Sequence, residues 1–466
     1  MPPRPRTLDR SIVDGPVAAA VFKLAWPTML QNMIAGLQGV IDHALVGHFV
    51  GFTANAGIGV SWQIFLVVMT FVGSLFTGMA VLAARAAGAG DQGQMNRVVY
   101  QALLTTIVLC LVVLAPVGWL LSPALLDLVH ATAAVKAEAL PFLRIMFVCS
   151  AGLMLQFLFG GAMRAAGDAQ TPLRLGIAMT VLNVAFNVVL IPGLGPIPAL
   201  GTAGAAIGTC LASALVATYA LVQLWRGGWV VSFAGLAHRR PDLAVIRELF
   251  RFGLPAGVQG VAMNVAGVLL LRYIGGLALS AQAQAAWAVG YVELFSFITW
   301  SSVGLMGAAA TVAGQNLGAG KPERVAAAAG AAARIGLTVA VVIGATFVLV
   351  PRLLLGVFGM TDPQAAGIAV TLLRYLAVSG CFVTVALSYT GALQGTGDTR
   401  SPLAISIVSQ IIVPLGLCAL FEATVGLEAW RIWLAVVAGH VTRATLSVWR
   451  FRQGKWRAIR VELSPG

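Results

Sequence analysis

The sequence predicts an all-α integral membrane protein with twelve transmembrane helices in two six-helix lobes. Three observations support this prediction: the composition, the number of long apolar segments and an internal repeat. Of the 466 residues, 59% are apolar and 10% are charged, and the mean hydropathy is +0.91. Soluble domains carry about 25% charged residues, so most of this chain is expected to be solvated by lipid.

Twelve segments of the chain are long and apolar enough to cross a bilayer, which takes about 20 mostly apolar residues. Short joints that contain polar residues, glycine or proline separate them. Lipid excludes open sheet edges and the alternation of barrel strands is absent, so the segments are predicted to be helices. They lie near residues 22–48, 56–84, 98–121, 139–163, 173–192, 202–225, 254–275, 283–313, 325–350, 367–393, 402–423 and 429–449.

The two halves of the chain repeat one another, with six of 13 positions identical in the longest match. Each half holds six predicted spans, so both halves enter the membrane from the same side. They are therefore expected to be parallel repeats about a pseudo-twofold axis along the membrane normal. The matching stretches, at offsets of 228 to 230 residues, are GAMRAAGDAQTPL (161–173) with GALQGTGDTRSPL (391–403), GAG (88–90) with GAG (318–320), and FKLAWPTMLQ (22–31) with FRFGLPAGVQ (250–259).

The basic residues indicate how the chain is oriented. Their scatter over short joints argues against a nucleic-acid interface, although the formal net charge is +13. With twelve spans, 23 of the 29 Lys and Arg residues fall on the side of the two termini, so both termini are predicted to be cytoplasmic in a multi-pass protein of the cell (inner) membrane. The remaining six are Lys136, Arg144, Arg272, Arg352, Arg374 and Arg431.

Polar stretches divide the chain into five predicted parts. The N-terminal stretch lacks the apolar core and cleavage site of a signal peptide. The five cysteines lie in apolar runs without a CxxC pair, so they are expected to be buried small side chains. The predicted parts are a cytoplasmic leader (1–21), an N-lobe with helices 1–6 (22–226), a cytoplasmic linker (227–249), a C-lobe with helices 7–12 (250–450) and a cytoplasmic tail (451–466).

Several motifs of the chain resemble those of the MATE (multidrug and toxic compound extrusion) transporters of bacterial type. These are VIDHALVGH in the first span, ARAAGAGD, VAGQNLGAGKPER, LNVAFNVVLIPG followed by LGTAGAAIGT, and the doubled GDxxxPL. The resemblance covers nearly the whole chain and implies a V-shaped pair of lobes, alternating access, and export of mostly cationic, lipophilic compounds against entering protons or sodium ions. Substrate is then expected near mid-membrane between the lobes.

The function predicted from this resemblance is secondary active multidrug export by a monomer that needs no cofactor. Neither GAG loop precedes GK[ST], so no nucleotide binding is expected. No acid–base, nucleophile or metal constellation indicates an enzyme. The alternative is a flippase for a lipid-linked oligosaccharide or related lipid, which would need several basic residues at mid-span. The chain places few there.

Asp42 is the first candidate for ion coupling. A carboxyl group at bilayer depth is rare and usually faces a bundle interior or a watery cavity. Such a group can exchange a proton, or hold a sodium ion together with other oxygen ligands. The alternative is a structural hydrogen bond between helices. Asp42 also matches the aspartate in the first span of the family. His43 points about 100° away from it and is expected to bond to a neighbouring helix instead.

Asn183 and Asn187 stand four residues apart and therefore share one face of the fifth span. Helix packing could aim that face at Asp42 and give a cluster that holds a cation or gates a proton. Asparagine also joins membrane helices without any further role, so an ion-binding cluster and a purely structural contact both remain possible interpretations. The two positions are similar to the ion cluster in the family's N-lobe.

Glu293 is the one acidic residue deep in the second half. It is a candidate for binding a cationic substrate or a second ion, and the alternatives are a pair with Arg272 or a helix-end charge that reaches water. Family members thought to be sodium-coupled carry acids in spans seven and ten, which this chain lacks, so the mechanism is expected to use the first half. Residues that could line a cavity are Gln38, Met33, Trp62, Gln259, Met263, Asn264, Tyr291 and Tyr389.

The repeated GDxxxPL motif is predicted to begin a helix on the cytoplasmic side. Asp168 and Asp398 each stand a few residues before Pro172 or Pro402, with a hydroxyl residue between them. A capping hydroxyl followed by proline at the first helical position is a helix-start pattern. These four residues are expected to brace a cytoplasmic gate without touching substrate.

Overall fold

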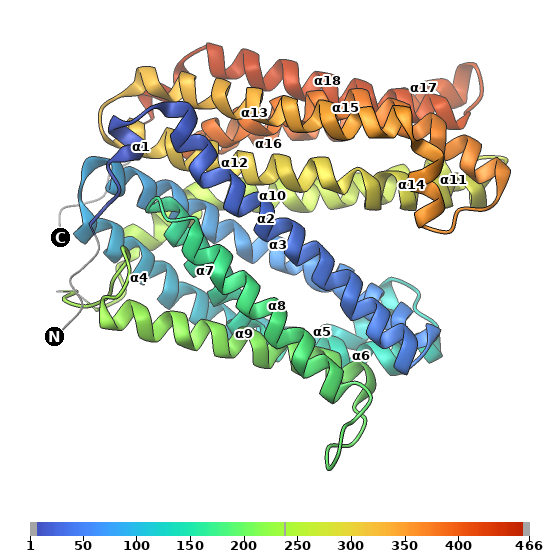
Figure 1. The fold of residues 1–466 in the computed structure, drawn as a ribbon, viewed down its shortest axis with the longest axis horizontal. Coiled ribbons are helices and arrows are strands. Elements are labelled where there is room, and N and C mark those ends of the chain that lie inside the picture. The colour runs from blue at the N-terminus through green and yellow to red at the C-terminus, as the bar shows by residue number, and fades with distance from the viewer. Residues whose placement is uncertain (1–6, 237–238, 460–466) are drawn as a thin grey trace. The chain divides into compact units, whose positions relative to one another are not determined.

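The computed structural model of the chain describes residues 7–236 and 239–459, and the described part is all-helical (Figure 1). Residues 1–6 of the predicted leader, 237–238 of the linker and 460–466 of the tail lie outside the described residues. The helices of the first half are α1 (Ser11–Asp14), α2 (Val17–Phe49), α3 (Phe52–Ala89), α4 (Gln92–Val108), η1 (Leu109–Leu114), α5 (Ala115–Leu128), α6 (Ala133–Val148), α7 (Ser150–Ala165), α8 (Gln170–Leu190) and α9 (Gly201–Arg226).

The second half is also all-helical in its described residues. Its central helices α12, α13, α15 and α18 lie side by side (Figure 1). The elements are α10 (Leu243–Gly275), α11 (Ser280–Trp287), η2 (Ala288–Leu294), α12 (Ser296–Gly318), α13 (Pro322–Leu349), α14 (Pro351–Val357), α15 (Pro363–Gly395), α16 (Arg400–Ile407), η3 (Val408–Ile412), α17 (Val413–Thr424), α18 (Ala429–Arg452) and η4 (Lys455–Ala458).

Among the described residues, ten continuous helical runs are long and apolar enough to cross a membrane. Helices α6 and α7, bent by 53° at their junction, form an eleventh. Helix α2 is 33 residues long, about 50 Å, but is not among these runs. Its apolar sequence is interrupted by Gln38, Asp42 and His43. Counting α2 as well gives the twelve predicted spans, and that count stays a prediction.

Three spans contain a π-helical segment, and proline accounts for two of them. Pro116 and Pro414 each follow a π segment directly, in α5 and α17. Proline has no N–H to donate and its ring crowds the carbonyl one turn earlier, so the preceding turn widens. The third segment, η2, has no proline and carries Tyr291 and Glu293.

The described chain forms two compact units, one of residues 7–9 and 30–257 and the other of 10–29 and 258–459. Helices α2 and α10 each run from one unit into the other.

Part of the predicted leader packs in the second unit. Ile12 and Val13 of α1 are buried there, and the Asn316 amide donates to the Ile12 carbonyl at 3.3 Å. Lys321 pairs with Asp14 at 2.8 Å. This hydrogen bond from Lys321, with a second from Arg10, holds the pKa of the Asp14 carboxyl below its usual value.

The linker before α10 lies on α4 in the first unit. Gln101 accepts from the Asp242 N–H at 3.0 Å and donates to the Arg240 carbonyl at 2.8 Å. Arg97 forms an ion pair with Asp242. Partial burial raises the pKa of the Asp242 carboxyl, but the bonds from Arg97 and from the Val245 N–H outweigh it and leave that pKa below its usual value. Arg240 and Asp242 therefore fix the start of α10.

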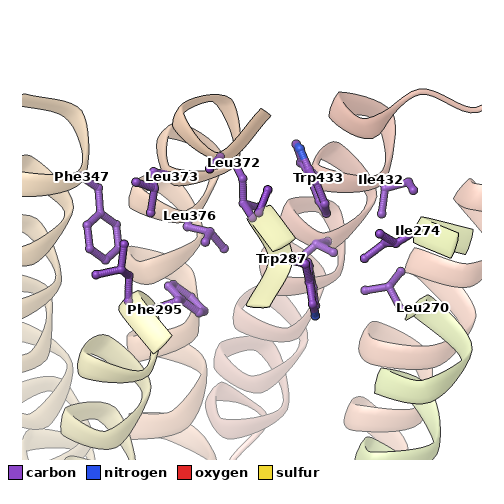
Figure 2. Close-up of a cluster of buried hydrophobic side chains, with 14 of the residues drawn as sticks. Leu270, Ile274, Trp287, Phe295, Phe347, Leu372, Leu373, Leu376, Ile432 and Trp433 are labelled. Atoms are coloured by element: carbon purple, nitrogen blue, oxygen red, sulfur yellow. The ribbon is translucent and has the colours of Figure 1, made fainter. Parts of the chain in front are cut away.

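The core of the second unit is apolar and aromatic (Figure 2). Leu270, which the repeat aligns with Asp42, lies in this cluster beside Ile274. Two of the cysteines, Cys110 and Cys418, are buried as expected. Cys149 is exposed, so the prediction that all five are buried was wrong.

Gly391 and Gly161 occupy equivalent positions of the repeat but differ in what surrounds them. A Cβ on Gly391 would collide with the backbone carbonyl of Met306. A Cβ on Gly161 would meet only the flexible end of Met79, at 3.3 Å. Gly391→Ala is expected to lower the free energy of unfolding by about 1–3 kcal/mol, measured by SDS-induced unfolding. Gly161→Ala is expected to be neutral or stabilising by up to about 1 kcal/mol. Equal losses would contradict this close approach of α12 to α15.

Candidate ion-coupling site

A polar face of α8 organises the candidate site in the first unit. Thr180, Asn183 and Asn187 follow the i, i+3, i+7 spacing of one helical face. Asn183 and Asn187 are fully buried. Thr180 donates its hydroxyl to Gln38 of α2 at 2.9 Å, so the same face meets α2 one turn before Asp42.

Asp42 of α2 lies against this face, half-buried. The Asn187 side chain donates Nδ2–H to Asp42 Oδ1 at 2.8 Å and to Asn183 Oδ1 at 3.3 Å. Asn183 in turn donates to the hydroxyl of Thr209 at 2.9 Å. The structure thus brings together the three residues that the sequence singled out for ion coupling, in one hydrogen-bonded chain from α2 through α8 to α9.

The cluster has more acceptors than donors. Asn187 Oδ1 is buried without a hydrogen-bond partner among the described residues, and Asp42 Oδ2 accepts no hydrogen bond from them. A buried acceptor without a partner is costly. This oxygen faces Gly208 of α9, so the Asn187 amide must rotate before Oδ1 can accept from a protonated Asp42 or join a hard cation there. The described residues form no group of three or more His, Cys, Asp or Glu side chains for a transition metal.

Two residues of the site were missed by the sequence reasoning. Thr209 ends the hydrogen-bonded chain, and its hydroxyl donates to the Ala205 carbonyl at 3.0 Å. Gly208 lies against Asn187, because a Cβ there would collide with Asn187 Oδ1. The only signal was the run of small residues in GTAGAAIGT, which lets helices approach closely.

Gly208→Ala is expected to weaken ion coupling, although Gly208 is not itself one of the proposed ion ligands. The added methyl group displaces the Asn187 amide, and loss of a supporting contact typically weakens a bound cation about tenfold or more. The measurement is the ion concentration that gives half-maximal transport. Gly204 is unsuitable as a control because it packs against backbone, so Gly307, with open space around it, is the matched position. An unchanged ion dependence in Gly208→Ala would contradict this role.

His43 is directed away from the cluster. Its Nδ1 is in hydrogen-bond contact with Asn55 Oδ1 of α3. This agrees with the expectation that it joins a neighbouring helix.

In the second unit, Glu293 lies in η2 with an exposed side chain and no ion pair among the described residues. The alternative pair with Arg272 is therefore not formed. Gln259 is buried and donates to the Ser406 hydroxyl at 2.7 Å. It also accepts from Gln394 at 3.4 Å, a contact that repeats the one between Arg164 and Gln31 at 3.3 Å in the first unit.

The other predicted cavity residues are spread over both units. Met33 and Trp62 of the first unit are 40% and 38% exposed. In the second unit, Met263, Asn264, Tyr291 and Tyr389 are partly exposed. Asn264 bonds to its own helix at Gly260, Tyr291 stacks on Trp287, and Tyr389 contacts Phe451.

The repeated GDxxxPL motif caps helices in both units, but the aspartate provides the cap. Asp168 accepts from the backbone N–H of Thr171 at 3.0 Å and from its hydroxyl. Asp398 does the same for Ser401. Helices α8 and α16 begin two residues before Pro172 and Pro402, so the expected capping hydroxyl with proline at the first position was wrong. The hydroxyl donates to the carboxylate instead.

An apolar chain with this many membrane-length helices and a buried polar cluster is typical of a membrane transport protein. A family model described as MatE matches residues 27–189 and 255–420. The chain therefore belongs to the MATE family of transporters, is a multi-pass membrane protein and is not an enzyme.

Two relatives and one solved structure illustrate the likeness. The chain is 27% identical to the "Probable multidrug resistance protein NorM" of Thermotoga maritima, over 94% of this chain and 92% of that one. It is 28% identical to the "Multidrug resistance protein NorM" of Burkholderia vietnamiensis, over 96% and 95%. A structure described as the outward-facing conformation of a multidrug resistance MATE family transporter of the MOP superfamily shares its fold, with a TM-score of 0.88, 19% identity and coverage of 96% and 98%.

Proposed function

We propose that this protein is a secondary multidrug exporter that exchanges organic, mostly cationic compounds for entering protons or sodium ions. The observation that carries the proposal is the hydrogen-bonded chain from Asp42 through Asn187 to Asn183, with its unpartnered oxygen. The names of the relatives support the substrate class. The twelve-span, two-lobe arrangement, the cytoplasmic termini and the monomeric state belong to the same proposal.

The chemistry at Asp42 gives the site two states. When Asp42 is charged, Oδ1 accepts from Asn187 as described above. When a proton binds, the carboxyl group becomes a donor, and a rotated Asn187 amide can accept from it through Oδ1. A sodium ion would instead draw the carboxylate and amide oxygens toward itself. Either event changes the bond that joins α2 to α8, and a bond with two arrangements can bias a conformational change.

The stoichiometry of the exchange determines which part of the ion's electrochemical gradient can drive export. One charge that crosses 100 mV releases about 2.3 kcal/mol, and a tenfold concentration ratio costs about 1.4 kcal/mol. Exchange of one entering cation for one leaving monovalent cation moves no net charge, so only the concentration gradient of the ion drives it. Exchange of two entering ions for one substrate cation uses the membrane potential as well.

The proposal is tested with purified protein in vesicles, loaded to impose a pH gradient or a sodium gradient. The expected result is uptake of a fluorescent organic cation that depends on one of these gradients. Translocation of a lipid-linked oligosaccharide without transport of the organic cation would replace this proposal with the flippase function.

A further inference from the structure

The second unit buries a cation that has no counter-charge. Arg443 of α18 is 8% exposed, and its Nε lacks a hydrogen-bond partner. No Asp or Glu among the described residues lies within ion-pair distance of it. The guanidinium carries five N–H donors and cannot accept. Leaving such a group buried and unpaired costs several kcal/mol.

Two more unpartnered polar atoms lie on the same face of α18. His440 and Ser447 stand three residues before and four residues after Arg443, so all three share one helical face. His440 is 4% exposed and Ser447 is fully buried. His440 Nδ1 and Ser447 Oγ both lack partners within the described chain. The face therefore offers several donors and one fixed positive charge.

Aromatic rings pack beside His440 on this face of α18. Phe295 stacks on the His440 ring with centroids 6.0 Å apart, and Tyr291 lies 5.3 Å from Phe295. The column continues through Trp287 to Trp433, and Figure 2 shows Phe295, Trp287 and Trp433 within the apolar core. Tyr291 and His440 both lie near Arg443. Apolar surroundings strengthen the attraction of this charge for an anion.

Arg450 on the same helix offers a contrast, because it is partly buried but has a counter-charge. It donates from Nε and Nη2 to Asp398 Oδ2, at 3.0 and 2.8 Å. Arg443, two turns earlier, has no such carboxylate. Water could satisfy its N–H groups but could not neutralise its charge, whereas an anion does both.

We propose that Arg443, with His440 as a further donor, forms a binding site for a small monovalent anion inside the second unit. The anion is either chloride or the carboxylate group of a small organic acid. Both present a compact negative charge that accepts several hydrogen bonds. The site is separate from the acidic cluster at Asp42, and its binding test does not depend on the proposed export function.

The test compares thermal unfolding of the detergent-purified full chain in sodium isethionate, sodium chloride and sodium formate at constant ionic strength. Isethionate is a bulky reference anion. For wild type, chloride or formate is expected to raise the unfolding midpoint in proportion to the logarithm of its concentration above the dissociation constant, by about 3 °C at 100 times that constant. A rise with chloride alone identifies an inorganic anion, and a rise with formate identifies a carboxylate.

Arg443→Gln is expected to abolish this rise and, in isethionate, to be at least as stable as wild type, because it removes an unpaired buried charge. Arg452→Gln makes the same charge change at an exposed position of α18 and is expected to keep the rise. If Arg443→Gln does not fold, Arg443→Lys keeps the charge and is expected to weaken anion binding at least tenfold, because it loses the planar fork. Equal rises in wild type and all variants, or no rise in wild type relative to isethionate, would overturn the proposal.

Discussion

Asp42→Asn is expected to abolish gradient-driven transport while leaving the protein folded. Asparagine has nearly the same shape as aspartate and can still accept from Asn187, so the contact between α2 and α8 is kept. It carries no charge and exchanges no proton, so neither a proton nor a sodium ion can be bound and released there. The measurement is uptake of a fluorescent organic cation into vesicles under an imposed ion gradient, which should fall to the level of vesicles without protein.

Asp127→Asn is the matched control for this variant. Asp127 lies in the same unit, is exposed, and pairs with Lys136 at the surface. Exposed ion pairs contribute little, so its transport is expected to equal that of wild type. Undiminished transport by Asp42→Asn would show that ion coupling takes place elsewhere in the chain.

Asp398→Ala is expected to lower the free energy of unfolding by about 3 kcal/mol. The carboxylate is 5% exposed and accepts from the Ser401 N–H and hydroxyl and from two nitrogens of Arg450. Its removal leaves the Arg450 guanidinium without its counter-charge. The value lies at the lower end for a buried pair because the Arg450 side chain is 22% exposed and keeps some hydration.

Asp168→Ala is the repeat-equivalent comparison for Asp398→Ala. Asp168 caps α8 through Gln170 and Thr171 and forms no ion pair within the described residues. Loss of a helix cap alone costs about 1 kcal/mol. SDS-induced unfolding of both variants gives the comparison. Equal losses would mean that Arg450 contributes nothing to the structural role of Asp398.

Much of the fold could be predicted from composition and periodicity, because lipid requires long apolar helices whose backbones satisfy themselves. The contact between Asp42 and Asn187 could also be anticipated. Two amides four residues apart must share a face, and a carboxyl group in a membrane needs polar neighbours.

The parts that could not be predicted depend on tertiary packing. Gly208 positions Asn187 only because α9 approaches α8 closely, and a glycine in a run of small residues does not reveal this. Glu293 lies in the π-helical segment η2, where 3.6-residue periodicity no longer tells which way a side chain points. Arg443 is invisible as a site in the sequence, because the absence of a carboxylate near it is a property of the folded unit.

Aligned positions of the repeat show where the polar residues of the two halves differ. Leu270 occupies the place of Asp42 and belongs to an apolar cluster. The Arg164–Gln31 contact of the first unit becomes Gln394–Gln259 in the second. This one contact is kept in both units, whereas the carboxyl group of the candidate site occurs only in the first.

In the proposed mechanism, substrate export and ion entry are one coupled process that passes through Asp42. The most direct measurement is ion movement driven by substrate: vesicles receive a gradient of the organic cation but no ion gradient, and a pH-sensitive dye or radioactive sodium reports ion flux. Wild type is expected to move protons or sodium ions against the direction of substrate flow, and Asp42→Asn is expected to move none. Substrate flux without ion movement in wild type, or equal ion movement in both proteins, would show that the two fluxes are not coupled through Asp42.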